Sequence, residues 1–336
     1  MLTLKKSLLL LCSGVLLIAG GAIMSRSASV MTFLKGNNTP VLKVTHTQEL
    51  QSIPVGKFAA QTIERFEFSD EGKALFSLLV AHYQDERQLQ RSAILFPPDK
   101  SESVLSSPTG LRAKIWQDAM RVMTGNAAKD ALILSWWDDG QRVHFLGGSN
   151  AWLSKPAAAT FVGPVWKALQ QQLPLASAEE SQHLSKMAAW LTMDSDKAIA
   201  EIVAHFGSSQ PIYLLVTNDL LLRQGELVSY GGSPLAFNSK NIPAGDDLHG
   251  GIAQVKRWAA EVGEGNYLVQ KEGAYYRAWT PANQETKNSL LVRLLPFMDS
   301  LKAKPKGVQQ VYQSGSGGYL SVYKLGENQT AASTAK

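Results

Sequence analysis

Cysteine is almost absent from this chain of 336 residues: the only one, Cys12, lies in an uncharged N-terminal segment. The rest of the chain therefore has no disulfide, no thiol nucleophile, and no cysteine ligand for zinc, an iron–sulfur cluster or covalently attached haem. Four leucines precede Cys12, where a lipoprotein site needs small residues, so lipidation is not expected. We predict no cofactor.

Clustered positive charge is also missing. The net charge is +5, but Lys5, Lys6 and Arg26 flank the uncharged segment, and without them it falls to +2. Because binding to a phosphate backbone requires clustered Lys and Arg, no nucleic-acid partner is expected. A composition of 45% hydrophobic and 18% charged residues excludes wholesale disorder, a coiled coil and a collagen-like fibre.

Long hydrophobic runs are limited to residues 7–24, which follow Lys5 and Lys6. This layout is typical of a signal peptide or of a retained single-span anchor. The run is longer than the roughly 7–15 apolar residues of a cleaved signal, and only a weak cleavage site follows, so a retained anchor over residues 1–25 is favoured. Cations ahead of the run predict an inner-membrane protein with its body in the periplasm.

The rest of the chain divides by pattern into a β-rich part and an α/β part. Alternating apolar residues between turn signals predict an antiparallel meander, and later short apolar runs alternate with helical spacing. We predict an α/β fold, with a mixed sheet flanked by helices in αβα layers, a small N-terminal antiparallel meander and one N-terminal transmembrane helix. The predicted segments are a tether at 26–57, the meander at 58–98, the α/β domain at 109–325 and a disordered tail at 326–336.

Several local signals refine the α/β part. The runs at 131–134 and 212–216 predict buried strands, and Ser177 with Glu180 forms a capping box that predicts a helix start. We expect one helix over 289–300, a functional loop over 231–251, a hairpin around residues 271–273 and a hairpin turn at 314–318.

A run of aromatic, acidic and basic residues follows the first of these strands, at the edge of an α/β sheet where ligands usually bind. The candidate binding residues are Trp136, Trp137, Asp138, Asp139, Gly140, Gln141, Arg142 and His144. If the strand continued past Gly140, then Asp138, Arg142 and His144 would share one face. The alternative is structural: one Trp packs in the core, the other covers an edge, and Asp138 caps a turn.

Part of this run resembles the Trp-Trp-Asp-x-Gly signature of the soluble domain of oligosaccharyltransferases. Trp136, Trp137, Asp138 and Gly140 match it, and a weaker likeness covers residues 111–325. In that family the Trp, Trp and Asp side chains bind the hydroxyl residue of the acceptor sequon. The family's catalytic carboxylates lie in a multi-span portion that this sequence lacks, and Asp139 stands where the family usually has Tyr. The resemblance implies acceptor binding without transfer.

The whole plan of one anchor, an exported domain and this Trp-Trp-Asp segment resembles the HaoB type. These are membrane-anchored accessory proteins associated with hydroxylamine oxidoreductase. The resemblance implies a protein partner, a multihaem hydroxylamine oxidoreductase. We therefore predict a non-catalytic accessory protein with a partner- or peptide-binding edge at the candidate residues. The alternative is an acceptor-binding subunit of an oligosaccharyltransferase-like glycan transfer system.

Metal binding has little support in the sequence. The six histidines show no HxH or HxxxH pairing, and a metal site needs three or four converging ligands. Asp246, Asp247 and His249 lie in the expected loop, where solvation is favoured over cation binding. No metal site is predicted.

Overall fold

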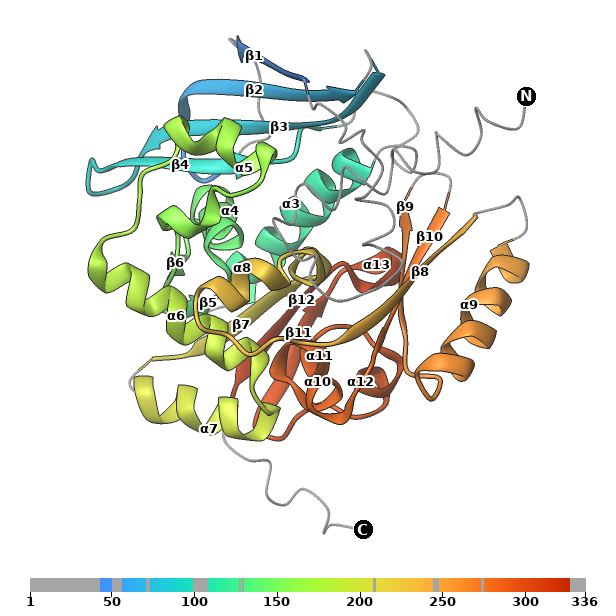
Figure 1. The fold of residues 1–336 in the computed structure, drawn as a ribbon. Coiled ribbons are helices and arrows are strands. Elements are labelled where there is room, and N and C mark those ends of the chain that lie inside the picture. Colours follow the sequence, from blue (N-terminus) through green and yellow to red (C-terminus); the bar gives the residue numbers. More distant parts are fainter. Residues whose placement is uncertain are drawn as a thin grey trace.

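The computed structural model describes residues 43–49, 56–70, 73–98, 108–126, 128, 130–207, 210–243, 248–272 and 275–326. The predicted anchor at 1–25 lies outside these residues, and so does the predicted tail at 326–336 except for Gly326. Within the described part of the chain, no helix is both long enough and apolar enough to cross a membrane. The predicted α/β class is confirmed, with antiparallel and mixed sheets and packed helices (Figure 1).

Four antiparallel strands in the order β1-β2-β3-β4 form the N-terminal sheet. They are β1 (Lys43–Glu49), β2 (Ala60–Asp70), β3 (Lys73–Gln84) and β4 (Gln90–Leu95). The last three confirm the predicted meander. Strand β1 lies in the segment expected to be a tether, and it pairs with β2 along its whole length. Its His46 ring stacks on Phe66 at 4.6 Å, which helps to fix this edge strand.

The second sheet has five strands in the order β11-β12-β7-β5-β6. Its strands are β5 (Leu132–Leu134), β6 (Asn150–Ala151), β7 (Ile212–Thr217), β11 (Val308–Gln313) and β12 (Leu320–Leu325). Strand β5 pairs in parallel with β6 and β7, whereas β12 pairs antiparallel with β7 and β11. Every residue of β5 and β7 is buried, which confirms the two apolar strands predicted from the sequence.

A third sheet, in the order β8-β10-β9, is antiparallel. It consists of β8 (Phe237–Pro243), β9 (Leu268–Glu272) and β10 (Tyr275–Pro281). Helix α9 (Leu248–Val262) contacts β8 and β10 (Figure 1). The hairpin predicted around 271–273 is confirmed by the pairing of β9 with β10. The prediction of a long loop over 231–251 is wrong, because most of this segment forms β8 and the start of α9.

Helices make up most of the remaining structure. The longer ones are α3 (Pro108–Asn126), α4 (Trp137–Gly147), α6 (Ala178–Thr192) and α7 (Ser195–Phe206). The short ones are α5 (Pro164–Leu169), α8 (Gln224–Ser229), α10 (Gln284–Asn288), α11 (Leu290–Leu294), α12 (Met298–Lys302) and α13 (Gly315–Gly318). Single 3-10 turns are η1 (Ala158–Thr160), η2 (Gln170–Gln172) and η3 (Asn218–Leu222).

Three further local predictions can be compared with the structure. The capping box is confirmed: Glu180 N donates to Ser177 Oγ at 3.2 Å, and Ser177 N donates to the Glu180 carboxylate at 2.8 Å. The prediction of a single helix over 289–300 is wrong. Helix α11 ends before Leu295, whose ψ of 156° is extended, and α12 begins after it. Leu295 precedes Pro296, and the proline ring disfavours helical backbone in the residue before it. The hairpin turn expected at 314–318 is confirmed by the antiparallel pairing of β11 with β12, and it contains the short helix α13.

The N-terminal sheet and the five-stranded sheet share one hydrophobic core. Phe66, Phe68 and Ile94 from the N-terminal sheet belong to the same buried cluster as Ile133 and Leu214. Helix α4 contacts β4 on one side and both β5 and β7 on the other, as its position between the two sheets in Figure 1 shows. The N-terminal sheet is therefore packed as part of the α/β body.

A substitution in the N-terminal sheet tests this shared core. Phe68 is fully buried, so Phe68→Ala should lower the free energy of unfolding by about 3–5 kcal/mol. All eight tryptophans follow residue 115, so tryptophan fluorescence reports the α/β part alone. We expect the variant to lower the midpoint of the fluorescence transition in urea. An unchanged midpoint would show that the N-terminal sheet unfolds separately.

Candidate functional site: a buried ionic cluster

Helix α4 begins three residues after the end of strand β5, at Trp137, the second of the candidate residues. Trp136 is extended, with ψ of 157°, and the chain is helical from Trp137 to Gly147. Asp138 and Asp139 occupy the first turn, where the helix dipole favours negative charge. Gly148, with φ of 65°, ends the helix in the left-handed conformation that glycine adopts easily. The expectation that the strand continues past Gly140 is therefore wrong.

Gly140 lies where α4 makes its closest approach to another part of the chain. A Cβ at this position would lie 1.8 Å from the backbone oxygen of Leu153. No other residue type fits there without moving α4 away from the segment that follows β6. The glycine is needed for close packing within a helix rather than for a turn.

Two arginines and three carboxylates form a buried ionic cluster after strands β5 and β7. Arg142 Nη1 donates to Asp139 Oδ1 at 2.7 Å and to Asp138 Oδ2 at 3.1 Å. Arg223 donates from Nη1 to Asp138 Oδ1, and from Nε to Glu226 Oε2 at 2.6 Å. Asp138 therefore lies between the two guanidiniums. The cluster joins α4 to the segment around α8.

Hydroxyl and indole donors satisfy the remaining carboxylate oxygens of the ionic cluster. Glu226 Oε1 accepts from Trp137 Nε1 at 2.9 Å and from Thr160 Oγ1 at 2.8 Å. Asp139 Oδ2 accepts from Thr217 Oγ1, at the end of β7, at 3.1 Å. These neutral donors let three carboxylates share an interior with two arginines.

Aromatic rings cover both guanidiniums. The Arg223 guanidinium lies 5.0 Å from the ring centroid of Trp137 and 4.5 Å from that of Trp166. Arg142 lies 4.6 Å from the Phe96 ring and 5.3 Å from the Trp116 ring. Weakly hydrated planar cations pack well against aromatic faces, which is why arginine rather than lysine suits these places.

The two neighbouring aspartates have opposite pKa shifts. Burial raises the pKa of Asp139 to about 8, and the adjacent Asp138 carboxylate adds to that rise. Burial also acts to raise the pKa of Asp138, but the guanidiniums of Arg223 and Arg142 outweigh it and lower that pKa. At neutral pH Asp139 is therefore mainly protonated. The two arginines are then balanced by the charges of Asp138 and Glu226.

The later residues of α4 reach the N-terminal sheet. Gln141 Oε1 accepts from the backbone N–H of Ile94 at 3.2 Å, and its Nε2 donates to Ser154 O at 2.9 Å. His144 Nδ1 is hydrogen-bonded to Tyr83 OH at 2.8 Å, and its ring stacks on Phe58 at 5.1 Å. Burial lowers the pKa of His144. His144 therefore lies apart from the ionic cluster.

The structure brings together most of the candidate residues, but inside the protein. From Trp136 to Arg142 every residue is buried, and Trp136 and Trp137 have no exposed surface. These residues therefore do not form an exposed recognition edge in the structure. The alternative, in which one Trp covers an edge, does not hold either, because both Trp side chains are buried. Whether any of them binds a ligand stays a prediction. In the part of the chain that the structure describes, no three His, Cys, Asp or Glu side chains converge as a metal site would need.

Sequence reasoning missed Arg223, Glu226, Thr217 and Thr160. One signal was available: Arg223 and Glu226 follow the second buried strand and are three residues apart. Because β5 and β7 are parallel neighbours, the residues after each strand meet at the same sheet edge. The acidic run after β5 therefore needed basic partners after β7.

Comparison with known families adds a finding that the geometry alone does not give. A family model described as "HaoA-associated protein HaoB" matches residues 6–325. The chain belongs to the HaoB family. The resemblance to this family noted in the sequence is therefore confirmed. A comparison with curated proteins found no match for this HaoB family member.

Solved structures similar to this HaoB family member include two domains of oligosaccharyltransferases. The C-terminal domain of PglB from C. jejuni is 11% identical with a TM-score of 0.37, over 63% of this chain and 99% of that domain. The C-terminal globular domain of the oligosaccharyltransferase from Archaeoglobus fulgidus is 11% identical with a TM-score of 0.32, over 63% and 96%. The resemblance noted in the sequence recurs here, but TM-scores this low carry no inference about function.

A pair of isosteric substitutions tests the charge assignment of the cluster. Asp138→Asn removes the carboxylate that lies between Arg142 and Arg223, so we expect a loss of about 3–5 kcal/mol in the free energy of unfolding. Asp139→Asn should cost much less at pH 7, because the raised pKa leaves Asp139 mainly uncharged and an amide oxygen still accepts from Arg142. Urea unfolding of both variants measures the difference. Equal losses would contradict the assignment.

The raised pKa of Asp139 also predicts how stability depends on pH. Folding takes up a proton between the unfolded pKa of about 3.9 and the folded pKa of about 8. This contribution is fully present below the unfolded pKa and is lost as the pH rises through the folded pKa, by at most about 1.4 kcal/mol per pH unit. We expect the parent to lose stability relative to Asp139→Asn from about pH 5 to pH 8. Parallel urea midpoints for the two proteins would disprove it.

Proposed function

We propose that this chain is a non-catalytic accessory protein that binds a HaoA protein at the periplasmic face of the inner membrane. The observation that carries the proposal is the family model, described as HaoA-associated, which matches residues 6–325. The uncharged run at 7–24 with Lys5 and Lys6 ahead of it supports an anchor with an exported body. Under this proposal, HaoA is the multihaem hydroxylamine oxidoreductase that the resemblance to the HaoB type implies.

The chemistry of the ionic cluster supports a role without catalysis. Each of its carboxylates accepts hydrogen bonds from an arginine inside the protein. A general acid or base has to reach a substrate, and buried carboxylates whose oxygens all accept internal hydrogen bonds do not. The cluster instead holds two parallel strand ends and two helices in one arrangement.

The glycan-transfer alternative is less well supported. By resemblance, Trp136, Trp137 and Asp138 would contact the hydroxyl residue of an acceptor. In this chain Trp137 Nε1 donates to Glu226 at 2.9 Å, and the Trp136 ring packs edge-on to Tyr230 at 5.7 Å. Both contacts are internal, so an acceptor has no access to these side chains in this conformation.

A pull-down tests the proposal. Tagged full-length protein is captured from gently solubilised native membranes, and the retained proteins are identified by mass spectrometry and haem staining. We expect HaoA to be retained with parent protein and equally with Asp139→Asn, whose fold should be preserved. With Asp138→Asn, retention should fall in proportion to the loss of folded protein.

The competing results are distinct. Absence of HaoA beside folded parent protein would disprove the accessory role, and retention of a polytopic glycosyltransferase instead would favour the glycan-transfer alternative. Loss of HaoA with a fully folded Asp139→Asn variant would mean that the cluster takes part in partner binding directly.

A further inference from the structure

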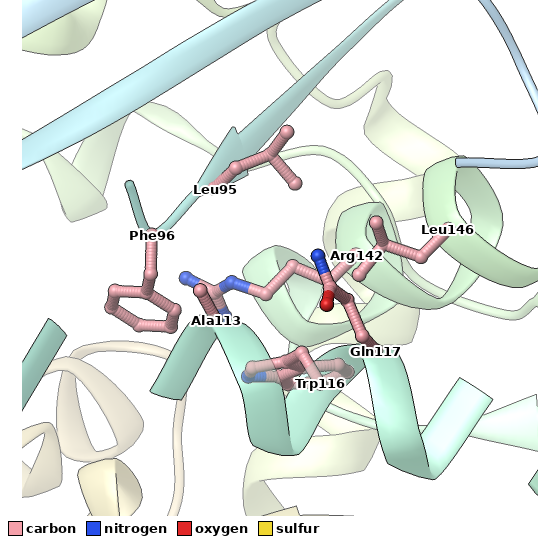
Figure 2. A pocket seen from close by; sticks show the side chains of 7 residues that line it. All are labelled: Leu95, Phe96, Ala113, Trp116, Gln117, Arg142 and Leu146. Carbon is pink, nitrogen blue, oxygen red and sulfur yellow. The ribbon is translucent and has the colours of Figure 1, made fainter. Parts of the chain in front are cut away.

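Positive charge in the interior of this protein is balanced. Arg142 crosses the small pocket between β4, α3 and α4 (Figure 2), and its guanidinium is already bound by Asp138 and Asp139. The pocket has room for about one water molecule, so no larger ligand fits there. Positive charge without an acidic partner lies instead on the surface.

A group of basic side chains lies where helix α12 leads into strand β11. This segment carries three lysines within five residues: Lys302, Lys304 and Lys306. Arg293 from α11 joins them, because its Nη2 donates to the backbone oxygen of Ala303 at 2.8 Å. We call Arg293 and the three lysines the basic patch. The patch was not identified from the sequence, because Arg293 joins the lysines only in the fold.

Acidic side chains balance only part of the basic patch. Asp299 Oδ1 lies 3.6 Å from Lys302 Nζ, but Asp299 Oδ2 also lies 3.1 Å from Lys287 Nζ, outside the patch. Among the residues that the structure describes, no carboxylate forms an ion pair with the other three cations of the patch. The patch therefore carries positive charge that the described part of the chain does not neutralise.

Lys304 shows that this arrangement is unfavourable in the isolated chain. Its side chain is half-buried, its Nζ donates to Tyr323 OH at 3.2 Å, and it lies 5.4 Å from the centroid of that ring. Burial lowers the pKa of Lys304, and the charge of Arg293 lowers it further. Like charges held close together repel each other, and an anion that binds between them removes the repulsion.

Backbone contacts hold the basic patch in a fixed position. Pro305, between two of its lysines, is buried, and the oxygen of Gly307 accepts from Gly326 N at 3.2 Å. Lys306 is exposed, and Leu301, just before the patch, is 49% exposed. Cations on a fixed backbone, beside an exposed apolar side chain, can bind a partner without a large loss of backbone freedom.

The position of the basic patch favours a protein partner over a lipid surface. Figure 1 shows α11 and α12 toward the opposite end of the structure from β1, where the described chain begins at Lys43. The uncharged run at 7–24, which is the proposed anchor, precedes Lys43 in the sequence. The chain therefore enters the described structure from the anchor at the end that is farther from the patch.

We propose that the basic patch is the docking surface for a partner protein that presents clustered Asp and Glu side chains. Arg293, Lys304 and Lys306 pair with these carboxylates, and Leu301 contacts apolar surface beside them. Opposite charges on two surfaces speed their encounter and help to select the partner. This inference rests on the proposed function for the identity of the partner, which is HaoA.

A labelled polyglutamate peptide tests the chemistry of the patch without HaoA. Its binding to the full-length protein is measured by fluorescence anisotropy at low salt. We expect Lys306→Glu, which reverses an exposed charge, to weaken binding about tenfold, and Lys304→Met to weaken it as well. Lys167→Glu makes the same charge change at an exposed position on α5, and should leave binding nearly unchanged.

The same variants are then compared in their binding to purified HaoA. We expect parent protein and Lys167→Glu to bind HaoA with an affinity that falls as the NaCl concentration rises, because salt screens exposed charges. Lys306→Glu should bind much more weakly at low salt and depend less on salt. Circular dichroism and urea unfolding verify that each variant is folded as the parent is.

The failures of this inference and of the proposed function are distinguishable. Equal peptide binding by parent and Lys306→Glu, or an equal loss with Lys167→Glu, would overturn the assignment of the patch. Unchanged HaoA binding by Lys306→Glu would overturn it too, and would leave the accessory role intact. If parent protein does not bind HaoA, the proposed function fails, and the peptide result alone decides whether the patch takes carboxylates. A Lys306→Glu variant that loses affinity only for micelles containing phosphatidylglycerol would assign the patch to lipid and contradict the proposal.

Discussion

Two arginines buried among three carboxylates impose the constraint on which the centre of this structure depends. A buried charge without a partner is far more costly than an exposed one, so Arg142 and Arg223 are tolerated only while Asp138 and Glu226 supply the balancing charges. These residues come from α4 and from the segment after β7. Because no single element completes the charge balance, strands β5 and β7 and helices α4 and α8 have to reach their positions together.

Helix α4 carries this constraint to the N-terminal sheet. Its first turn supplies the two aspartates, whereas Gln141 and His144, further along, bond to Ile94 and Tyr83. Gly140 permits the close approach to Leu153 that holds the helix against the other side. The helix thus connects the two sheets through polar contacts of defined geometry, and the shared apolar core fills the space around them.

The sequence predicted those parts of the fold that local patterns determine. The apolar strands β5 and β7, the meander and the Ser177 capping box were all found. Helix α4, which begins after Trp136, was not predicted, because a short polar run with one glycine fits a turn, a strand or a helix. Burial of the candidate site could not be predicted either. Charged residues are usually exposed, and Arg223 bonds to Asp138 across 85 positions of sequence.

The position of the ionic cluster determines how its residues can influence a partner. Trp136 and Trp137 have no exposed surface, so an effect of the cluster on binding has to pass through the elements that cover it. Hydrogen bonds hold those elements to the cluster. The hydroxyls of Thr160 and Tyr230 are hydrogen-bonded to each other at 2.9 Å, Thr160 also donates to Glu226, and the Tyr230 hydroxyl bonds to the backbone of Ala157. A change in the charge balance of the cluster would therefore act on a partner through the shape of these outer segments. The polar run from Trp136 to Arg142 can thus shape the surface of the protein without being part of that surface.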